Sequence, residues 1–335
     1  MSHTVCVGCI ANPMAGKDIR RLVAYGSRID NQEKVHIVRR LLLGLERAGA
    51  TRVLCMPDTY HTALKALQGI RHSLELEVQI LDMDVQGTAR DTLRATQWMR
   101  EAGVRCLIVL GGDGTHRVVA KASADIPLVP LSSGTNNVFP RIIEGTLAGL
   151  AAGVYARHAP GLSGMVRSTK RLEVLRNGEL EDIALVDAAV SAQQFVGARA
   201  LWDVSTIREL FLTQGTPLNI GLSSIGGWSF PIDAQDPEGI HLTLQHEGGA
   251  IHAPIGPGLI VPVGIAEHRR MSPGERIRLQ RAPAILALDG EREILLHEED
   301  RWEMMLTWNG PKVLDVESTL LAAQRRRLLD RGPIP

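Results

Sequence analysis

Short apolar runs alternate with amphipathic stretches along the first half of the chain. The apolar runs that we interpret as strands span 4–11, 52–56, 76–81, 104–110 and 126–131. The stretches with apolar residues at helical spacing span 34–48, 62–71, 88–102 and 116–124. Nearly continuous apolar strands separated by helices are typical of a parallel sheet covered on both faces. The pattern therefore predicts a doubly wound parallel α/β domain over residues 1–155.

The pattern changes in the second half, after a Gly- and Pro-containing linker at 157–164. Asn177-Gly178 lies between apolar stretches at 171–176 and 180–190, and this dipeptide is a strong hairpin signal. From about residue 239 to 308, short strands alternate with turns. These features predict a β-rich, sandwich-like domain over 165–311. Within it we predict one helix, at 203–212, and helical periodicity returns at 316–329.

Composition narrows the class of protein. The 335 residues are 44% hydrophobic and 22% charged, which allows a large core. Because 37 basic residues balance 37 acidic ones, charge gives no reason to expect nucleic acid or an anionic membrane as the main partner. No apolar run is long enough for a membrane span, and no signal peptide is evident. The four cysteines all fall in predicted buried strands, so we expect reduced thiols and a cytoplasmic protein.

The most informative stretch is GGDGT, residues 111–115, which follows the apolar run 104–110 and precedes a predicted helix. A strand, a glycine-rich turn and a helix offer backbone N–H groups and a positive helix end to an anion. Asp113 would be unfavourable among phosphates unless it held a metal ion or accepted a proton. A plain Asp-Gly turn is the alternative. The strand–helix context favours a phosphate site with Asp113 at its centre.

Two further polar loops follow predicted strands, at 12–17 and at 132–137. In doubly wound sheets, ligands bind outside the carboxyl ends of the strands, so we expect the three loops to form one site. The second loop, Ser133-Gly134-Thr135-Asn136-Asn137, supplies hydroxyl and amide groups of the kind that line nucleotide sites. Neither the dehydrogenase motif G-x-G-x-x-G nor the P-loop motif follows any strand, which argues against those two classes.

Two acidic positions in the second half are also candidates. Asp187 lies in an apolar strand, where an uncompensated charge is costly, so it is either hydrogen-bonded core structure or a ligand contact. Asp289-Gly290-Glu291 is either a hairpin turn or part of the site. The small-residue stretch 218–227, which includes Ser224, could let a ligand approach the backbone closely.

GGDGT, the N-P-x-A-G loop at 12–16, and an α/β half followed by a β half together resemble the NAD kinase and diacylglycerol kinase superfamily. The resemblance covers nearly the whole chain and is greatest to the acetoin-catabolism protein X group of ATP-NAD kinase-like proteins. It implies that Asp113 is the central catalytic carboxylate and that the last helix, within 312–335, packs back on the first domain. It also implies ATP or polyphosphate as donor, Mg²⁺ held indirectly through Asp113, and a homo-oligomer.

The acceptor is less well defined by the resemblance. NAD kinases carry an Asn-Glu or Asn-Asp pair that recognises the nucleotide, and here the matching place is Val186-Asp187. The segment 221–227 only loosely resembles the NAD kinase segment rich in Thr, Ser and Gly. The loop 133–137 is more similar to the G-T-x-N loop of lipid kinases, and Asp289-Gly290-Glu291 matches them too, with Glu291 as the proposed base.

We therefore expect a kinase with ATP and NAD as partners, NAD being the favoured acceptor and acetoin catabolism its setting. A lipid or sphingoid kinase and an inactive nucleotide-binding regulator are the alternatives. Asp113 and Glu291 are the expected catalytic residues. The expected nucleotide-binding residues are Asn12, Gly16, Gly111, Gly112, Gly114, Thr115, Ser133, Gly134, Thr135, Asn136, Asn137, Asp187, Ser224 and Asp289.

Overall fold

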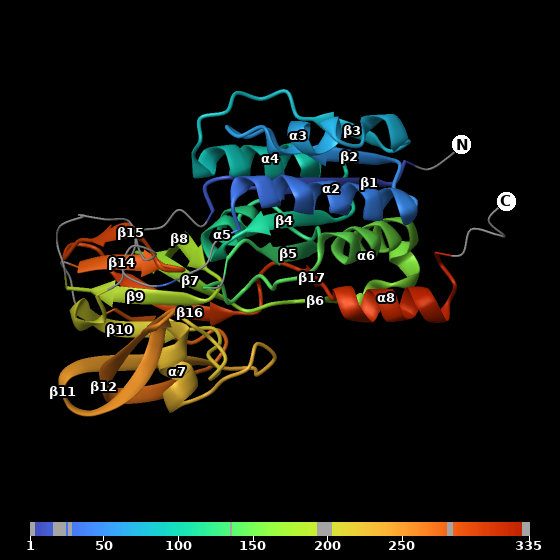
Figure 1. The fold of residues 1–335 in the computed structure, drawn as a ribbon. Coiled ribbons are helices and arrows are strands. Elements are labelled where there is room, and N and C mark those ends of the chain that lie inside the picture. Colours follow the sequence, from blue (N-terminus) through green and yellow to red (C-terminus); the bar gives the residue numbers. More distant parts are fainter. Residues whose placement is uncertain are drawn as a thin grey trace.

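The computed structural model describes residues 4–15, 25, 29–134, 136–192, 203–279 and 284–329, with the backbone alone at 160, 246–250 and 291–293. Figure 1 shows an α/β part, a β part beside it, and a last helix that lies against the α/β part. The fold class predicted from the sequence is thus confirmed. None of the described helices is long and apolar enough to cross a membrane.

The α/β part is built on a seven-stranded sheet with the order β3-β2-β1-β4-β5-β17-β6. Strands β1 to β5 and β17 are parallel, and β6 is antiparallel to β17. The strands are β1 (Cys6–Ala11), β2 (Arg52–Cys55), β3 (Glu77–Ile80), β4 (Leu107–Gly111), β5 (Leu128–Ser132), β6 (Val166–Arg167) and β17 (Val313–Leu314). Strand β1 is buried along its whole length, as its unbroken apolar run predicts.

Helices cover both faces of this sheet. Alternate residues of β1 point to opposite faces, so Val7 and Cys9 join one core and Cys6 and Ile10 the other. The first core is completed by α2 (Asn31–Arg47), α3 (Thr62–Gln68) and α6 (Gly145–His158). The second is completed by α4 (Ala89–Glu101) and α5 (Asp113–Ala120). A short 3-10 turn, η1 (Arg71–Ser73), follows α3, and two more, η2 (Ala159–Gly161) and η3 (Ser163–Met165), follow α6.

The β part consists of two antiparallel sheets with a shared core, as a sandwich requires. The six-stranded sheet has the order β12-β11-β10-β9-β14-β15, and the four-stranded sheet the order β13-β16-β7-β8. The first comprises β9 (Asp187–Ser191), β10 (Ile207–Leu212), β11 (Gly239–Gly256), β12 (Leu259–Met271), β14 (Ala284–Leu288) and β15 (Glu291–Leu296). The second comprises β7 (Arg171–Arg176), β8 (Glu179–Ala184), β13 (Arg276–Arg278) and β16 (Trp302–Thr307).

The prediction of a helix at 203–212 is wrong. The chain forms a 3-10 turn, η4 (Val204–Thr206), and then strand β10 in the middle of the six-stranded sheet. Phe211 points into the sandwich core while Leu210 and Leu212 point to the other face, where α7 (Ser223–Ser229) covers them. A strand that is buried on both faces has apolar residues at consecutive positions, so its hydrophobic pattern cannot be distinguished from that of a short buried helix. The stretch that does form a helix, α7, is rich in Ser and Gly and gave no helical pattern.

The chain returns to the α/β part at its end. Strand β17 adds to the first sheet next to β5, and α8 (Val316–Arg325) follows directly. Ala323 of α8 packs with Ala48, Val154 and Leu162, so the last helix packs on the first part as the resemblance implied. Figure 1 shows α8 lying beside α6.

Candidate active site at the carboxyl ends of three strands

The three polar loops follow neighbouring strands. Strands β1, β4 and β5 are adjacent, and their parallel direction places their carboxyl ends at one edge of the sheet. The chain leaves β1 toward β2 and β3 on one side, and leaves β4 toward β5 on the other. The gap between β1 and β4 is therefore the topological switch point, where doubly wound folds bind their ligands. The structure brings the three loops together as expected.

The GGDGT segment is the start of a helix. Gly111 ends β4, Gly112 is the N-cap of α5, and Asp113 is its first residue, three residues before the predicted start. No side chain caps α5 within the described residues, and the N-terminus of a helix is where backbone N–H groups and the helix dipole favour an anion.

The two leading glycines of the motif allow neighbouring side chains to pack closely against the backbone. Gly112 has a φ of −96°, so it does not need the left-handed region. A Cβ on Gly111 would lie 2.6 Å from the Cβ of Thr115, and one on Gly112 would lie 3.0 Å from Oδ1 of Asn137. A larger residue at Gly111 would therefore clash with Thr115 of the same motif, and one at Gly112 would clash with Asn137 of the loop after β5.

The Asp113 carboxylate is held by the segment that follows β5. Its Oδ1 accepts the backbone N–H of Phe139 at 2.9 Å and that of Val138 at 3.2 Å. These two bonds fix the rotamer of a side chain that is only partly buried. A carboxylate is also the kind of group that accepts a proton or binds a hydrated metal ion.

The first loop is tied to GGDGT and to α2. Nδ2 of Asn12 donates to Oγ1 of Thr115 at 2.9 Å. Lys34 of α2 is 1% exposed, and its ammonium donates to the carbonyl oxygens of Asn12 (2.9 Å), Pro13 (3.2 Å) and Ala15 (2.9 Å). Lys34 thus positions this loop by binding three of its carbonyl oxygens.

Sequence reasoning missed Lys34, although a signal was present. Lys34 stands four, seven and eleven residues before Val38, Leu41 and Leu45, on the buried face of α2. A lysine at an apolar position of a helix needs polar partners nearby, and the polar loop 12–17 was the candidate.

The third loop contributes an amide and buried small residues. Nδ2 of Asn137 donates to Oγ of Ser132 at 2.7 Å, and the N–H of Ser133 donates to the carbonyl of Gly111 at 3.2 Å. Ser133 and Gly134 are buried and Asn136 is partly buried. Gly16 and Thr135, which were also expected at this site, lie outside the described residues.

Asp289 is a buried carboxylate that holds the turn before β9. Its oxygens accept the N–H groups of Leu185 (3.0 Å), Val186 (2.7 Å) and Asp187 (3.3 Å), and its φ is +51°. Burial raises the pKa of Asp289, while the charge of Arg117 opposes that shift. The turn before β9 therefore depends on Asp289, and Asp187 is placed by it.

Arg117 joins the two parts of the molecule next to the site. It lies on α5, is 3% exposed, and places Nη1 3.3 Å from Oδ2 of Asp182 and Nε 3.7 Å from Oδ2 of Asp289. Lys121, one turn further on, lies 2.6 Å from Oδ1 of Asp182. The helix that begins at Asp113 is thus fixed to strands of the β part.

Two further residues expected at the site, Ser224 and Glu291, lie in the β part. Ser224 is buried in α7, and its hydroxyl donates to the carbonyl of Gly221 at 2.7 Å. Glu291 begins β15 opposite Leu288, but its side chain is outside the described part of the structure.

The described residues contain no group of three His, Cys, Asp or Glu side chains that could hold a metal ion. Mg²⁺ does not need such a group, because it is commonly bound through one or two carboxylates, substrate phosphates and water. Asp113 supplies a carboxylate of this kind, held in place by the N–H groups of Val138 and Phe139.

These features define a two-part protein with a kinase-like N-terminal half. Residues 7–159 match the ATP-NAD kinase N-terminal domain, and residues 170–309 match the acetoin catabolism protein X C-terminal domain. The chain is 39% identical to acetoin catabolism protein X of Cupriavidus necator, over 98% of this chain and 95% of that protein. It belongs to the acetoin catabolism protein X family.

Two solved structures are similar to most of this chain at low sequence identity. Two structures of a candidate diacylglycerol kinase from Bacillus anthracis superpose with TM-scores of 0.46 and 0.42, at 13% and 14% identity. The first covers 94% of this chain and 98% of that one, and the second 92% and 96%. Likenesses this distant say nothing about the substrate.

Proposed function

We propose that this protein transfers the terminal phosphoryl group of ATP, or of polyphosphate, to a hydroxyl of a small molecule. NAD is the favoured acceptor, and acetoin catabolism is the proposed setting, because the curated relative carries that name. The observation that carries the proposal is the placement of Asp113 on the uncapped first turn of α5, at the switch point between β1 and β4.

The donor phosphates would lie against the N-terminus of α5 and the loop at 12–15. Phosphoryl transfer requires mainly positioning and stabilisation of charge, and backbone N–H groups at a helix start supply both. Mg²⁺, when bound through Asp113 and the phosphates, would neutralise the charge that develops on the transferred group. Asp113 itself would accept the proton of the acceptor hydroxyl, since its carboxylate is held in place by Val138 and Phe139.

The acceptor would lie between Asp113 and the β part, near Asp187, with Glu291 as a second candidate base. Val186 takes the place of the amide found in NAD kinases, so one hydrogen bond to a nucleotide acceptor is missing. The same feature supports the second candidate function, a regulator that binds nucleotide without transferring phosphate.

One experiment separates these functions. The purified protein is incubated with Mg²⁺ and ATP labelled at the terminal phosphate, with NAD or with diacylglycerol in detergent micelles as acceptor. We expect label in NADP, and at least about a hundredfold less of it from the Asp113→Asn variant. Label in phosphatidate instead would identify a lipid kinase. Saturable binding of ATP or NAD without transfer to either acceptor, from ATP or from polyphosphate offered in its place, would identify the regulator and overturn the kinase proposal.

A further inference from the structure

A cavity lies between the α/β part and the β part, beside α8. Its volume is about 580 Å³, within the range of small-molecule sites. It is lined from β5, from the segment 138–143, from α8 and from the β part, and its lining includes Phe139, Lys170, Leu185 and Leu320. Neither Asp113 nor Asp187 is among the described residues that line it. We call it the α8 cavity.

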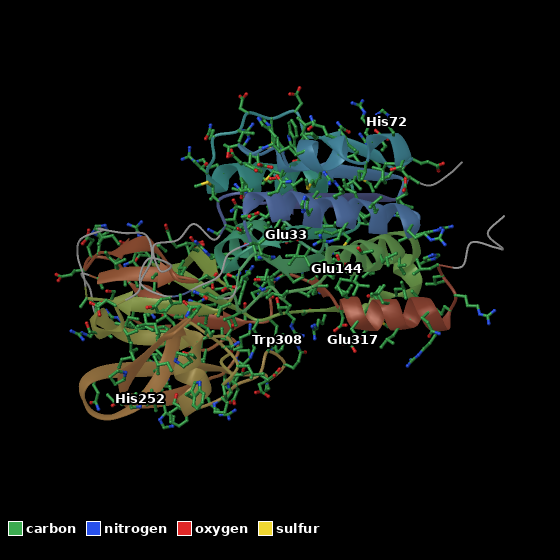
Figure 2. The ribbon with its side chains drawn as sticks, in the orientation of Figure 1. Glu33, His72, Glu144, His252, Trp308 and Glu317 are labelled. Atoms are coloured by element: carbon green, nitrogen blue, oxygen red, sulfur yellow. The ribbon has the colours of Figure 1, made fainter. Side chains whose placement is uncertain are left out.

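The α8 cavity contains a buried cation. Lys170 is 3% exposed, and its ammonium donates to the backbone carbonyls of Asp233 (3.1 Å) and Glu238 (2.7 Å). An ammonium has three N–H donors, so one is left for a ligand in the cavity. Burial lowers the pKa of Lys170 to about 8, with the nearby acidic side chains opposing the shift, which leaves it mostly protonated at pH 7. Figure 2 labels Trp308, whose ring lies 5.9 Å from this ammonium.

The mouth of the α8 cavity is apolar and exposed. Ile142, Leu147 and Leu321 all line it and are 74%, 45% and 48% exposed. Large apolar side chains that gather at the rim of a cavity mark a binding surface more often than isolated ones do. Arg141, next to Ile142, and Arg167 add two further positive groups to the lining. Three acidic residues also line it, Asp233, Asp315 and Glu317. Asp315 is engaged as the N-cap of α8 and with Arg167 at 3.5 Å.

Two residues connect the α8 cavity to the Asp113 carboxylate of the candidate active site. Val138 and Phe139 line the cavity, and their backbone N–H groups hold Asp113. A ligand in the cavity would therefore press on the segment that positions Asp113.

We propose that the α8 cavity is a second binding site, for an organic anion with an apolar body. Its acidic group would pair with Lys170, and its apolar body would pack against Ile142, Leu147 and Leu321. A buried cation beside a mainly apolar wall matches a carboxylate or sulfonate on a hydrophobic body, and it discriminates against a neutral molecule of the same shape. This proposal does not depend on phosphoryl transfer.

Two fluorescent probes that differ by one charge test the proposal on the full chain. 8-Anilinonaphthalene-1-sulfonate carries the acidic group, and N-phenyl-1-naphthylamine has the same ring system without it. We expect saturable binding of the sulfonate at one site per chain, at least about tenfold tighter than the neutral probe, which corresponds to an ion pair worth about 1.4 kcal/mol. Equal affinities, or no saturable binding, would overturn the proposal.

Variants locate the site. Lys170→Met should weaken the sulfonate about tenfold and leave the neutral probe within about twofold. Because Lys170→Met also removes two bonds to backbone carbonyls, a second variant, Leu321→Glu, introduces charge at the mouth and should weaken both probes about tenfold. Leu64→Glu is the matched control, since Leu64 lies on α3 at 41% exposure and outside the lining. Loss of binding in Leu64→Glu to the same extent would show that the probes bind elsewhere and would overturn the proposal.

Discussion

At the residue scale, the candidate site depends on side chains that are oriented by segments far away in sequence. Asp113 is held by N–H groups 25 and 26 residues later, and the loop at 12–15 is held by Lys34. The motif letters alone identify Asp113 and Asn12 but do not show what fixes them. Two substitutions test these two roles separately.

The first prediction concerns Asp113 as proton acceptor. Asp113→Asn keeps the size and one hydrogen-bond acceptor but removes the charge, so turnover should fall by about 10²–10⁴, the usual contribution of a general base. The measurement is the initial rate of labelled product under saturating ATP. Asp125→Asn, an exposed carboxylate beyond α5, is the control and should keep the original rate. An unchanged rate in Asp113→Asn would remove Asp113 from this role.

The second prediction concerns Lys34 as a positioning residue. Lys34→Met leaves three backbone carbonyls of the loop without their donor, so the free energy of unfolding should fall by about 2–3 kcal/mol. The KM for ATP should rise about tenfold, more than kcat falls, because the loop no longer holds its shape. Urea unfolding and steady-state kinetics measure both. Lys65→Met is the control, because the ammonium of Lys65 lies over the Tyr60 ring and touches no phosphate loop. Equal effects in the two variants would contradict the assignment.

At the element scale, much of the α/β part could be predicted because each strand is apolar and each helix has one apolar face. The strand order 3-2-1-4-5 could not be read from those patterns, yet the three loops were correctly expected at one edge, since parallel strands end together. Strand β10 was missed because both of its faces are covered. Its register is set by β9 and β11, which are distant along the chain.

Helix α5 carries a pH-dependent group that the sequence did not single out. His116 is fully buried directly below GGDGT, with Nδ1 2.8 Å from the carbonyl of Gly112 and Nε2 3.2 Å from that of Val109. Burial lowers the pKa of His116 from 6.5 to about 4, and the two carbonyls oppose that shift. The folded protein takes up a proton at His116 less readily than the unfolded chain does. The contribution of His116 to the free energy of unfolding is therefore complete above pH 6.5 and is lost as the pH falls toward 4.

The third prediction follows from that shift. Between pH 7 and pH 4, the free energy of unfolding should fall by up to about 3 kcal/mol through His116 alone. Urea unfolding at several pH values measures the total slope, and the difference between the original chain and His116→Gln isolates this contribution. His72→Gln, at an exposed position labelled in Figure 2, should keep the original slope. If His116→Gln keeps it as well, His116 does not titrate in this range.

At the scale of the whole molecule, the two parts are joined beside the site by charges that no local pattern could predict. Arg117 follows GGDGT by two residues, and its partners lie 65 and 172 residues later, in the β part. Asp289 was predicted as part of the site from its motif, and the structure places it at this junction, where it also holds the turn at 185–187. The helix that begins at Asp113 and the turn that places Asp187 are thus fixed relative to each other by Arg117, with Lys121 adding a contact to Asp182.

The fourth prediction tests this junction. Arg117→Met leaves the buried carboxylate of Asp289 without its cation, so the free energy of unfolding should fall by about 3 kcal/mol, and activity should fall with it. Asp289→Asn should restore part of that stability in the double variant, because it removes the unpaired charge. Arg269→Met, which breaks the exposed pair with Glu275 at 2.8 Å, is the control and should cost less than about 1 kcal/mol. Strict additivity of the two buried substitutions in urea unfolding would show that Arg117 and Asp289 do not interact. The positions of the β part and of Asp187 relative to Asp113 would then have to depend on the Asp182 contacts of α5 instead.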